Sequence, residues 1–249
     1  MKKVLGLLCI LFLGNSCIMT DSTPLVIGHR GAMGHETENT LASVQKALDL
    51  GVDMIEIDVF QIESGEIVVF HDERVDRLAN SGGKIEEYNI FDLKQLTLDG
   101  NHKIPMLQEV LELIDNKVVL NIELKGANTT ERVNFIMDYY VKDKGWALDN
   151  FIISSFKWDE LRKMRQQNPS VQIAILTEED PVKALTIAKE VNAVAINPDF
   201  SKLTAEKAAK IQKEGYKLYP WTVNDPKDIQ RMKDYNVDGI ITNYPERVN

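Results

Sequence analysis

Cysteine is almost absent from this chain, and both of its cysteines, Cys9 and Cys17, lie in the first 17 residues. The rest of the sequence therefore contains no disulfide, so its stability must come from a hydrophobic core. The chain has 249 residues, of which 44% are hydrophobic and 27% charged, values that are ordinary for a soluble globular protein. This length is enough for one large domain or two small ones.

Basic residues are outnumbered by acidic ones, because 29 Lys and Arg residues stand against 38 Asp and Glu residues and leave a net charge of −9. This balance argues against a nucleic-acid partner, since phosphate backbones are bound by clustered Lys and Arg. It does not exclude a small anionic substrate, because a bound metal ion or a local Arg/Lys pair can reverse the sign of the charge at one site.

Long hydrophobic runs are missing as well, because the apolar run at residues 4–13 is shorter than the roughly 20 residues that span a bilayer. With its basic start and the small residues before Cys17, this run has the layout of a secretory signal. Cys17 stands where bacterial lipoproteins carry their lipidated cysteine, although Gly14 replaces the usual leucine three residues earlier.

We therefore expect a signal peptide at 1–17 with Cys17 lipidated, a polar tether at 18–24 and a folded domain at 25–249. This predicts an exported protein of the periplasm or cell envelope that meets the membrane only through its lipid anchor. An ordinary cleaved signal peptide with an incidental cysteine is the alternative.

After residue 24, short runs rich in Val and Ile alternate with amphipathic segments of helical period. The strand candidates are 25–27, 54–59, 118–124, 151–154, 172–176, 193–196, 217–221 and 239–242, and the helix candidates are 40–50, 107–114, 130–140, 157–167, 181–190, 204–214 and 226–235. Such alternation predicts an α/β fold with a parallel sheet. If Arg247 and its neighbours close the last unit, there are eight strand-then-helix units, which match a (β/α)8 TIM barrel. An open doubly wound sheet is the alternative.

One element breaks this alternation. The apolar run 67–71 follows the second strand after only a few residues, so the two must form an antiparallel hairpin, because parallel neighbours need a longer crossover. The chain then shows little periodicity as far as Lys103. We interpret residues of about 60–104 as a small insertion after strand two, on the face where such barrels carry their active sites.

Glu56 and Asp58 are the sharpest local feature, because side chains two apart on a strand point the same way. Glu123 from the neighbouring strand is a third candidate. Three carboxylates suit one hard divalent cation, Ca²⁺ or Mg²⁺, better than zinc. Alternatively, they form a salt-bridge network with Arg30 and Lys125.

Two of the four histidines, His29 and His71, follow strand candidates beside these acids. Histidine is the usual choice for proton transfer near neutral pH, and a pair allows one to accept a proton while the other donates one. His35 and His102 lack this context, and we expect them at the surface.

Arg30 and Lys125 lie beside the same acids and are natural ligands for a phosphate group. Arg offers a planar fork of donors, whereas Lys offers a point charge. Alternatively, the two cations only neutralise the acids, and both roles are compatible.

The order of several short motifs along the chain resembles that of the glycerophosphodiester phosphodiesterase family over residues 25–247. The matching motifs are His29-Arg30-Gly31, Glu38-Asn39-Thr40, Glu56-Ile57-Asp58, His71-Asp72, Asn121-Ile122-Glu123-Leu124-Lys125, 221–224 and 238–243. Two positions depart from the family pattern. Thr37 replaces the usual Pro, and residues 62–65 replace the usual hairpin turn, which affects loop geometry rather than the proposed catalytic groups.

The resemblance implies a TIM barrel with an insertion after strand two, and hydrolysis of glycerophosphodiesters to sn-glycerol 3-phosphate and an alcohol. It implies the metal ligands Glu56, Asp58 and Glu123, the acid–base pair His29 and His71, and the substrate-binding residues Arg30, Lys125, Glu38, Asn39, Phe156 and Trp221. A lysophospholipase D on the same scaffold is the main alternative, and a non-catalytic surface lipoprotein that binds sugar or phosphate is another.

Overall fold

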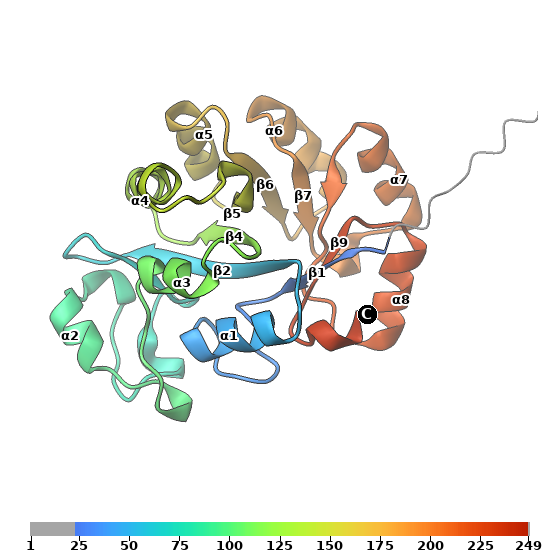
Figure 1. Ribbon diagram of the computed structural model, residues 1–249. Coiled ribbons are helices and arrows are strands. Elements are labelled where there is room, and N and C mark those ends of the chain that lie inside the picture. The colour runs from blue at the N-terminus through green and yellow to red at the C-terminus, as the bar shows by residue number, and fades with distance from the viewer. Residues whose placement is uncertain (1–22, 249) are drawn as a thin grey trace, which may run out of the picture.

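The computed structural model describes residues 23–248, in which eight parallel strands form a nearly closed barrel (Figure 1). The strands are β1 (Leu25–Gly28), β2 (Met54–Gln61), β4 (Val119–Leu124), β5 (Phe151–Ser155), β6 (Gln172–Thr177), β7 (Ala195–Pro198), β8 (Lys217–Leu218) and β9 (Gly239–Thr242). Their order around the barrel follows the chain, with β1 hydrogen-bonded to both β2 and β9. Backbone hydrogen bonds from Asp238 N to Leu218 O and from Ile241 N to Pro220 O, at 3.1 and 3.0 Å, join β9 to the β8 segment. The predicted TIM barrel is confirmed, and the open sheet is wrong.

Helices cover the outside of the barrel between successive strands (Figure 1). They are α1 (Leu41–Asp49), α3 (Leu107–Ile114), α4 (Thr130–Asp143), α5 (Trp158–Gln167), α6 (Leu185–Glu190), α7 (Ala205–Lys213) and α8 (Pro226–Asp234), with a 3₁₀ turn at Pro245–Arg247 after β9. Thr40 caps α1, because its side chain accepts a hydrogen bond from Ser43 N at 3.2 Å. The helix expected at 181–190 instead divides into a 3₁₀ turn, Pro181–Ala184, and α6.

The interior of the barrel has an apolar layer and, further along the strands, a polar layer at their carboxyl ends. An apolar layer closes its lower part, formed by Ile27, Met54, Ile152, Ala174, Ala195, Tyr219 and Ile241. Because strand side chains alternate between faces, positions two residues further along also point inward. These positions hold His29 after β1, Glu56 on β2 and Ser154 on β5. The same alternation therefore places an apolar layer beneath the polar groups, which lie at the carboxyl ends of the strands.

The segment between β2 and α3 forms a compact insertion with an apolar core of its own (Figure 1). It begins with β3 (Ile67–Val69), which pairs antiparallel with β2 as the predicted hairpin. It continues through 3₁₀ turns at Val75–Arg77, Ile85–Glu87 and Asp99–Asn101 and the short helix α2 (Ile90–Gln95). The core of the insertion consists of Phe60, Ile62, Val68, Phe70, Val75, Ile85, Leu93, Leu96, Leu98 and Ile104.

The expected signal peptide, the lipidation site Cys17 and nearly all of the tether lie outside the described residues. Within residues 23–248, none of the helices has the length and apolar character needed to cross a bilayer.

Candidate active site

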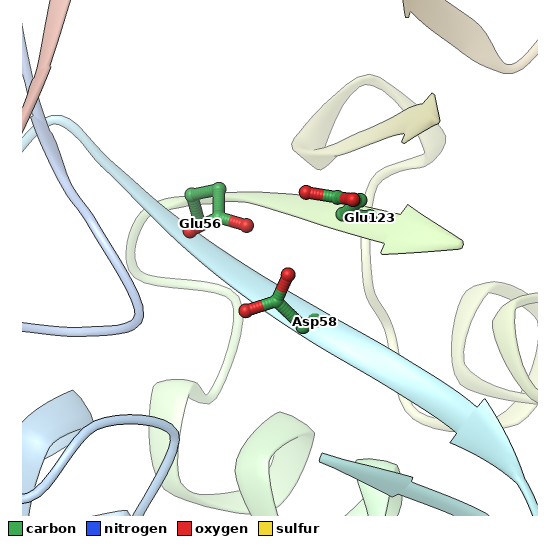
Figure 2. A group of neighbouring side chains, drawn as sticks. All are labelled: Glu56, Asp58 and Glu123. Atoms are coloured by element: carbon green, nitrogen blue, oxygen red, sulfur yellow. The ribbon is translucent and has the colours of Figure 1, made fainter. Parts of the chain in front are cut away.

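Three acidic side chains converge at the barrel mouth, as predicted (Figure 2). Glu56 and Asp58 extend from β2, and Glu123 lies opposite Asp58 on β4. One carboxylate oxygen from each residue lies within 4.8 Å of the others, and all three residues are buried. Burial, together with the neighbouring Asp58 charge, raises the pKa of Glu56 well above its usual range and that of Glu123 to about 8. This buried, all-oxygen donor set fits a divalent cation such as Ca²⁺ or Mg²⁺.

The two predicted cationic side chains, Arg30 and Lys125, also lie close to these acids. Arg30 Nε lies 3.4 Å from Asp58 Oδ2, and Lys125 Nζ lies 3.0 Å from Glu123 Oε1. The network as a whole joins five carboxylates to three cations: Glu38, Glu56, Asp58, Asp72 and Glu123 with Arg30, Arg77 and Lys125. The salt bridges are therefore present, yet with all five acids ionised they leave an excess of two negative charges, which is the charge that one divalent cation neutralises.

His71 follows β3 and faces the pocket from the insertion. Its Nδ1 lies 2.6 Å from Asp72 Oδ1, and its Nε2 lies 3.2 Å from Lys125 Nζ. A carboxylate only accepts hydrogen bonds, so Nδ1 carries the proton of the neutral ring and Nε2 presents its lone pair. Burial lowers the pKa of His71, which keeps the ring neutral at neutral pH.

His29 is held in the same tautomer by a different partner. Its Nδ1 lies 2.7 Å from Asn243 Oδ1, which follows β9, and its Nε2 lies 4.0 Å from Glu56 Oε2. Burial and the nearby Arg30 charge lower the pKa of His29 to about 4. Asn243 belongs to a motif of the resemblance, but no pattern in the sequence assigns it this role.

The loop after β1 turns sharply so that His29 and Arg30 reach different groups. Arg30 and Gly31 have φ angles of 50° and 82°. A Cβ on Gly31 would lie 2.4 Å from Ser43 Oγ, so only glycine fits between this loop and α1. The resulting backbone aims Arg30 N at Glu56 Oε2, 3.0 Å away, while its Nη1 donates to Glu38 Oε1 at 2.6 Å.

Glu38 and Asn39 lie behind this loop and do not line the pocket. Asn39 Nδ2 donates to Asp58 Oδ2 at 2.8 Å, so it orients a proposed metal ligand. Glu38 accepts hydrogen bonds from Arg30 and also from Arg77 of the insertion. Arg77 was not predicted from the sequence, because it lies in a segment without periodicity.

The pocket itself is a cavity of about 260 Å³ with one polar and one apolar wall. The polar wall carries His29, Arg30, Glu56, His71, Glu123 and Lys125, with Asn121 and Ser154 beside them. Phe156 and Trp221 lie on the apolar wall as expected, with ring centroids 5.4 Å apart in an edge-to-face arrangement.

The two remaining histidines lie away from this pocket. His35 Nε2 is 3.0 Å from Glu246 Oε2, and His102 Nε2 is 3.9 Å from Glu36 Oε2. Both keep about a quarter or more of their side-chain surface exposed, with 30% for His35 and 25% for His102. These positions agree with the surface role expected for them.

Fold and site together define a (β/α)8-barrel hydrolase of phosphate diesters. Residues 29–247 match the model of the glycerophosphoryl diester phosphodiesterase family, and the chain belongs to this family. The protein is therefore an enzyme, which excludes the non-catalytic lipoprotein.

Individual relatives agree with this assignment. A glycerophosphodiester phosphodiesterase of Caldanaerobacter subterraneus is 34% identical over 236 residues, which cover 89% of this chain and 95% of that protein. The structure of an Oleispira antarctica phosphodiesterase in complex with the product sn-glycerol-3-phosphate is similar, with a TM-score of 0.83, 27% identity and coverage of 91% and 95%. A human lysophospholipase D is 23% identical over 89% of this chain and 84% of that protein.

Proposed function

We propose that the enzyme hydrolyses glycerophosphodiesters, which are deacylated phospholipid headgroups, to sn-glycerol 3-phosphate and an alcohol. The observation that carries this proposal is one cavity lined by two histidines, two cations and the carboxylates of Glu56 and Glu123, with the buried Asp58 carboxylate within 4.8 Å of both acids. The product complex of the Oleispira antarctica phosphodiesterase supports the same substrate class.

Arg30 and Lys125 would bind the phosphate, the first through its planar fork and the second as a point charge. Phe156 and Trp221 would pack against the carbon atoms of glycerol or the alcohol. Glu38 and Asn39 would act through the residues they hold, because they orient Arg30 and Asp58.

Glu56, Asp58 and Glu123 would hold one divalent cation, Ca²⁺ or Mg²⁺. When bound, this cation supplies Lewis-acid chemistry, which polarises a phosphate oxygen and lowers the pKa of a neighbouring hydroxyl. The backbone N–H of Arg30 fixes one oxygen of Glu56, which leaves the rest of that carboxylate free for the cation.

The two histidines would divide the proton transfers. His29 Nε2 would accept the proton of the glycerol hydroxyl next to the phosphate as this oxygen attacks phosphorus. His71, in the form that has taken up a second proton at Nε2, would protonate the leaving alcohol as its P–O bond breaks, because Asp72 beside Nδ1 stabilises this charged ring. Water would then open the cyclic phosphate, with the proton transfers reversed.

Release of sn-glycerol 3-phosphate from glycerophosphocholine and glycerophosphoethanolamine tests the proposal. We expect activity with Ca²⁺ or Mg²⁺, loss of activity with a chelator, and a decrease in kcat of about 10²-fold or more in His29→Ala and His71→Ala. His35→Ala is the matched control and should retain wild-type rates. A metal-loaded wild type that cleaves no phosphodiester would contradict the proposal.

A lysophospholipase D is the second candidate, and the human relative of that name favours it. Such an enzyme would release choline from lysophosphatidylcholine faster than from glycerophosphocholine. Comparing kcat/KM for the two substrates decides between these functions.

We also propose that the protein is exported to the periplasm or cell envelope and anchored there through a lipid on Cys17. The basic start, the apolar run and the small residues before Cys17 support this proposal. Metabolic labelling with a radioactive fatty acid should mark the wild type but not Cys17→Ser.

A further inference from the structure

A second hollow adjoins the apolar wall of the active-site cavity. This neighbouring hollow of about 490 Å³ is formed by the ends of β5 and β6 and the start of α5. Phe156, Leu176 and Glu178 line both spaces. A ligand too long for the first cavity can therefore extend past these three residues, and we call the second space the outer hollow.

Glu178 is unusual among the charged residues of the cavity. The other charged groups there belong to the acid trio, to the histidine pair or to the cations that would bind phosphate. Glu178 is exposed and has no ion-pair partner within residues 23–248, whereas Glu179 beside it pairs with Lys183 at 3.4 Å. A free carboxylate beside a phosphate site repels an anionic ligand, unless that ligand brings a positive charge to this wall.

Aromatic rings line the same two spaces. Phe156 and Trp221 meet edge to face, and Trp158 lines the outer hollow. Trp158 Nε1 donates to Leu176 O at 3.1 Å, which fixes the indole ring against the end of β6. Aromatic faces attract ammonium groups through their quadrupoles, and a nearby carboxylate adds to this attraction.

Lys125 connects the outer hollow with the reaction. Its Nζ lies 3.0 Å from Glu123 and 5.8 Å from the centre of the Phe156 ring. A phosphate held by Lys125 therefore lies beside Phe156, and one of its ester groups can pass over this ring towards Glu178.

We propose that the outer hollow is the subsite for the alcohol part of the substrate and that Glu178 selects an alcohol with a positively charged ammonium group. Choline and ethanolamine have this chemistry, whereas glycerol does not. The inference rests on the proposed function and specifies its substrate class.

Steady-state kinetics of Glu178→Gln test the subsite on three substrates: glycerophosphocholine, glycerophosphoethanolamine and glycerophosphoglycerol. We expect KM to rise about three- to tenfold for the two cationic substrates, the scale of one exposed cation contact. The KM for the neutral substrate and all kcat values should change less than about twofold. Glu206→Gln is the matched control, because it removes the same charge from an exposed position on α7 outside both spaces, and it should leave the ranking of substrates unchanged.

An equal change in KM for all three substrates, or no change for the cationic pair, would overturn the subsite. The thermal midpoint of each variant separates these outcomes from misfolding. Wild-type activity on all three substrates without this selectivity contradicts the subsite alone. Absence of wild-type activity on every glycerophosphodiester contradicts the proposed function instead.

Discussion

Arg77 of the insertion donates two hydrogen bonds to Glu38 of the barrel, from Nη1 at 2.8 Å and from Nη2 at 2.7 Å. Its Nε donates to Asp72 at 2.6 Å, and Asp72 contacts His71. Glu38 also accepts a hydrogen bond from Arg30. One guanidinium therefore connects the histidine on the insertion with the proposed phosphate ligand on the barrel.

We predict that Arg77→Ala lowers kcat at least tenfold, because His71 and Arg30 both lose a fixed neighbour. Each charge-assisted hydrogen bond stabilises its partners by about 1.5–3 kcal/mol. Arg77→Lys should recover only part of the rate, since an ammonium group cannot reproduce the fork that reaches Glu38 and Asp72 together. Steady-state kinetics over a pH range check this, because a misplaced His71 should also shift the pH profile of kcat.

Arg74→Ala is the matched control for this experiment. Arg74 lies on the same insertion, its side chain is 57% exposed, and its ion pair is with Asp76 rather than with a site residue. It should leave kcat within about twofold of the wild type. Equal losses in the two variants would show that Arg77 only stabilises the insertion and does not position the site.

Removal of one proposed metal ligand should weaken divalent-cation binding before it affects folding. We predict that Glu123→Gln lowers the affinity for Ca²⁺ or Mg²⁺ at least tenfold, because the trio loses one of its charged oxygen ligands. Isothermal titration of the chelator-treated protein measures this affinity directly. Addition of the cation should also raise the melting temperature of the wild type, since a ligand that binds only the folded state stabilises it.

Glu63→Gln provides the comparison for the metal experiment. Glu63 is exposed on the turn that joins β2 to β3. The Glu63→Gln variant should bind the divalent cation with the same affinity as the wild type. Unchanged affinity in Glu123→Gln would argue that Glu56, Asp58 and Glu123 act only as partners of Arg30 and Lys125.

The acid trio was predictable from sequence because it depends on a local rule. Glu56 and Asp58 are two residues apart on a strand, and strand alternation aims both into the barrel. The placement of Glu123 required only that β4 lie beside β2, which the alternation of strands and helices already implied.

The contacts of Arg77 follow no such rule. It meets Glu38 across 39 positions of the chain, through an insertion whose backbone is mostly irregular. The six-residue helix α2 was missed for a related reason, because it is too short for its apolar residues to show a helical period. The strand expected at 217–221 is shorter in the structure, where β8 ends before Pro220, a residue without a backbone N–H.

Gly31 should be intolerant of any side chain. We predict that Gly31→Ala destabilises the fold by about 2–4 kcal/mol, because it adds left-handed backbone strain to a clash with Ser43. Gly51→Ala is the matched control, since its φ of 71° is similar but its Cβ would lie in open space. Gly51→Ala should lower the free energy of unfolding only through backbone strain, by about 1–2 kcal/mol. Urea unfolding measures both, and equal losses would rule out a tight contact between the β1 loop and α1.

Glu160 is a buried acid outside the active site, and it ties α5 to the start of α4. It is 2% exposed and accepts hydrogen bonds from Lys163 Nζ at 2.7 Å, Thr130 Oγ1 at 2.7 Å and Asn128 N at 3.1 Å. Burial opposes its ionisation, but these donors outweigh burial and lower the pKa of Glu160 below its usual value. Because the folded pKa is the lower one, its stabilisation is present above about pH 4.3 and is lost as pH falls through the folded pKa.

We therefore predict that Glu160→Gln lowers the free energy of unfolding by about 1–3 kcal/mol at pH 7. The difference from the wild type should shrink at pH 3, because the wild-type carboxylate then begins to take up a proton and loses the same interactions. Urea unfolding at the two pH values measures the difference, with Glu206→Gln on the exposed face of α7 as the control that should match the wild type at both. If the deficit of Glu160→Gln is the same at pH 3 and pH 7, the loss comes from altered packing, because a contribution from the charge must vanish once both proteins are neutral at this position.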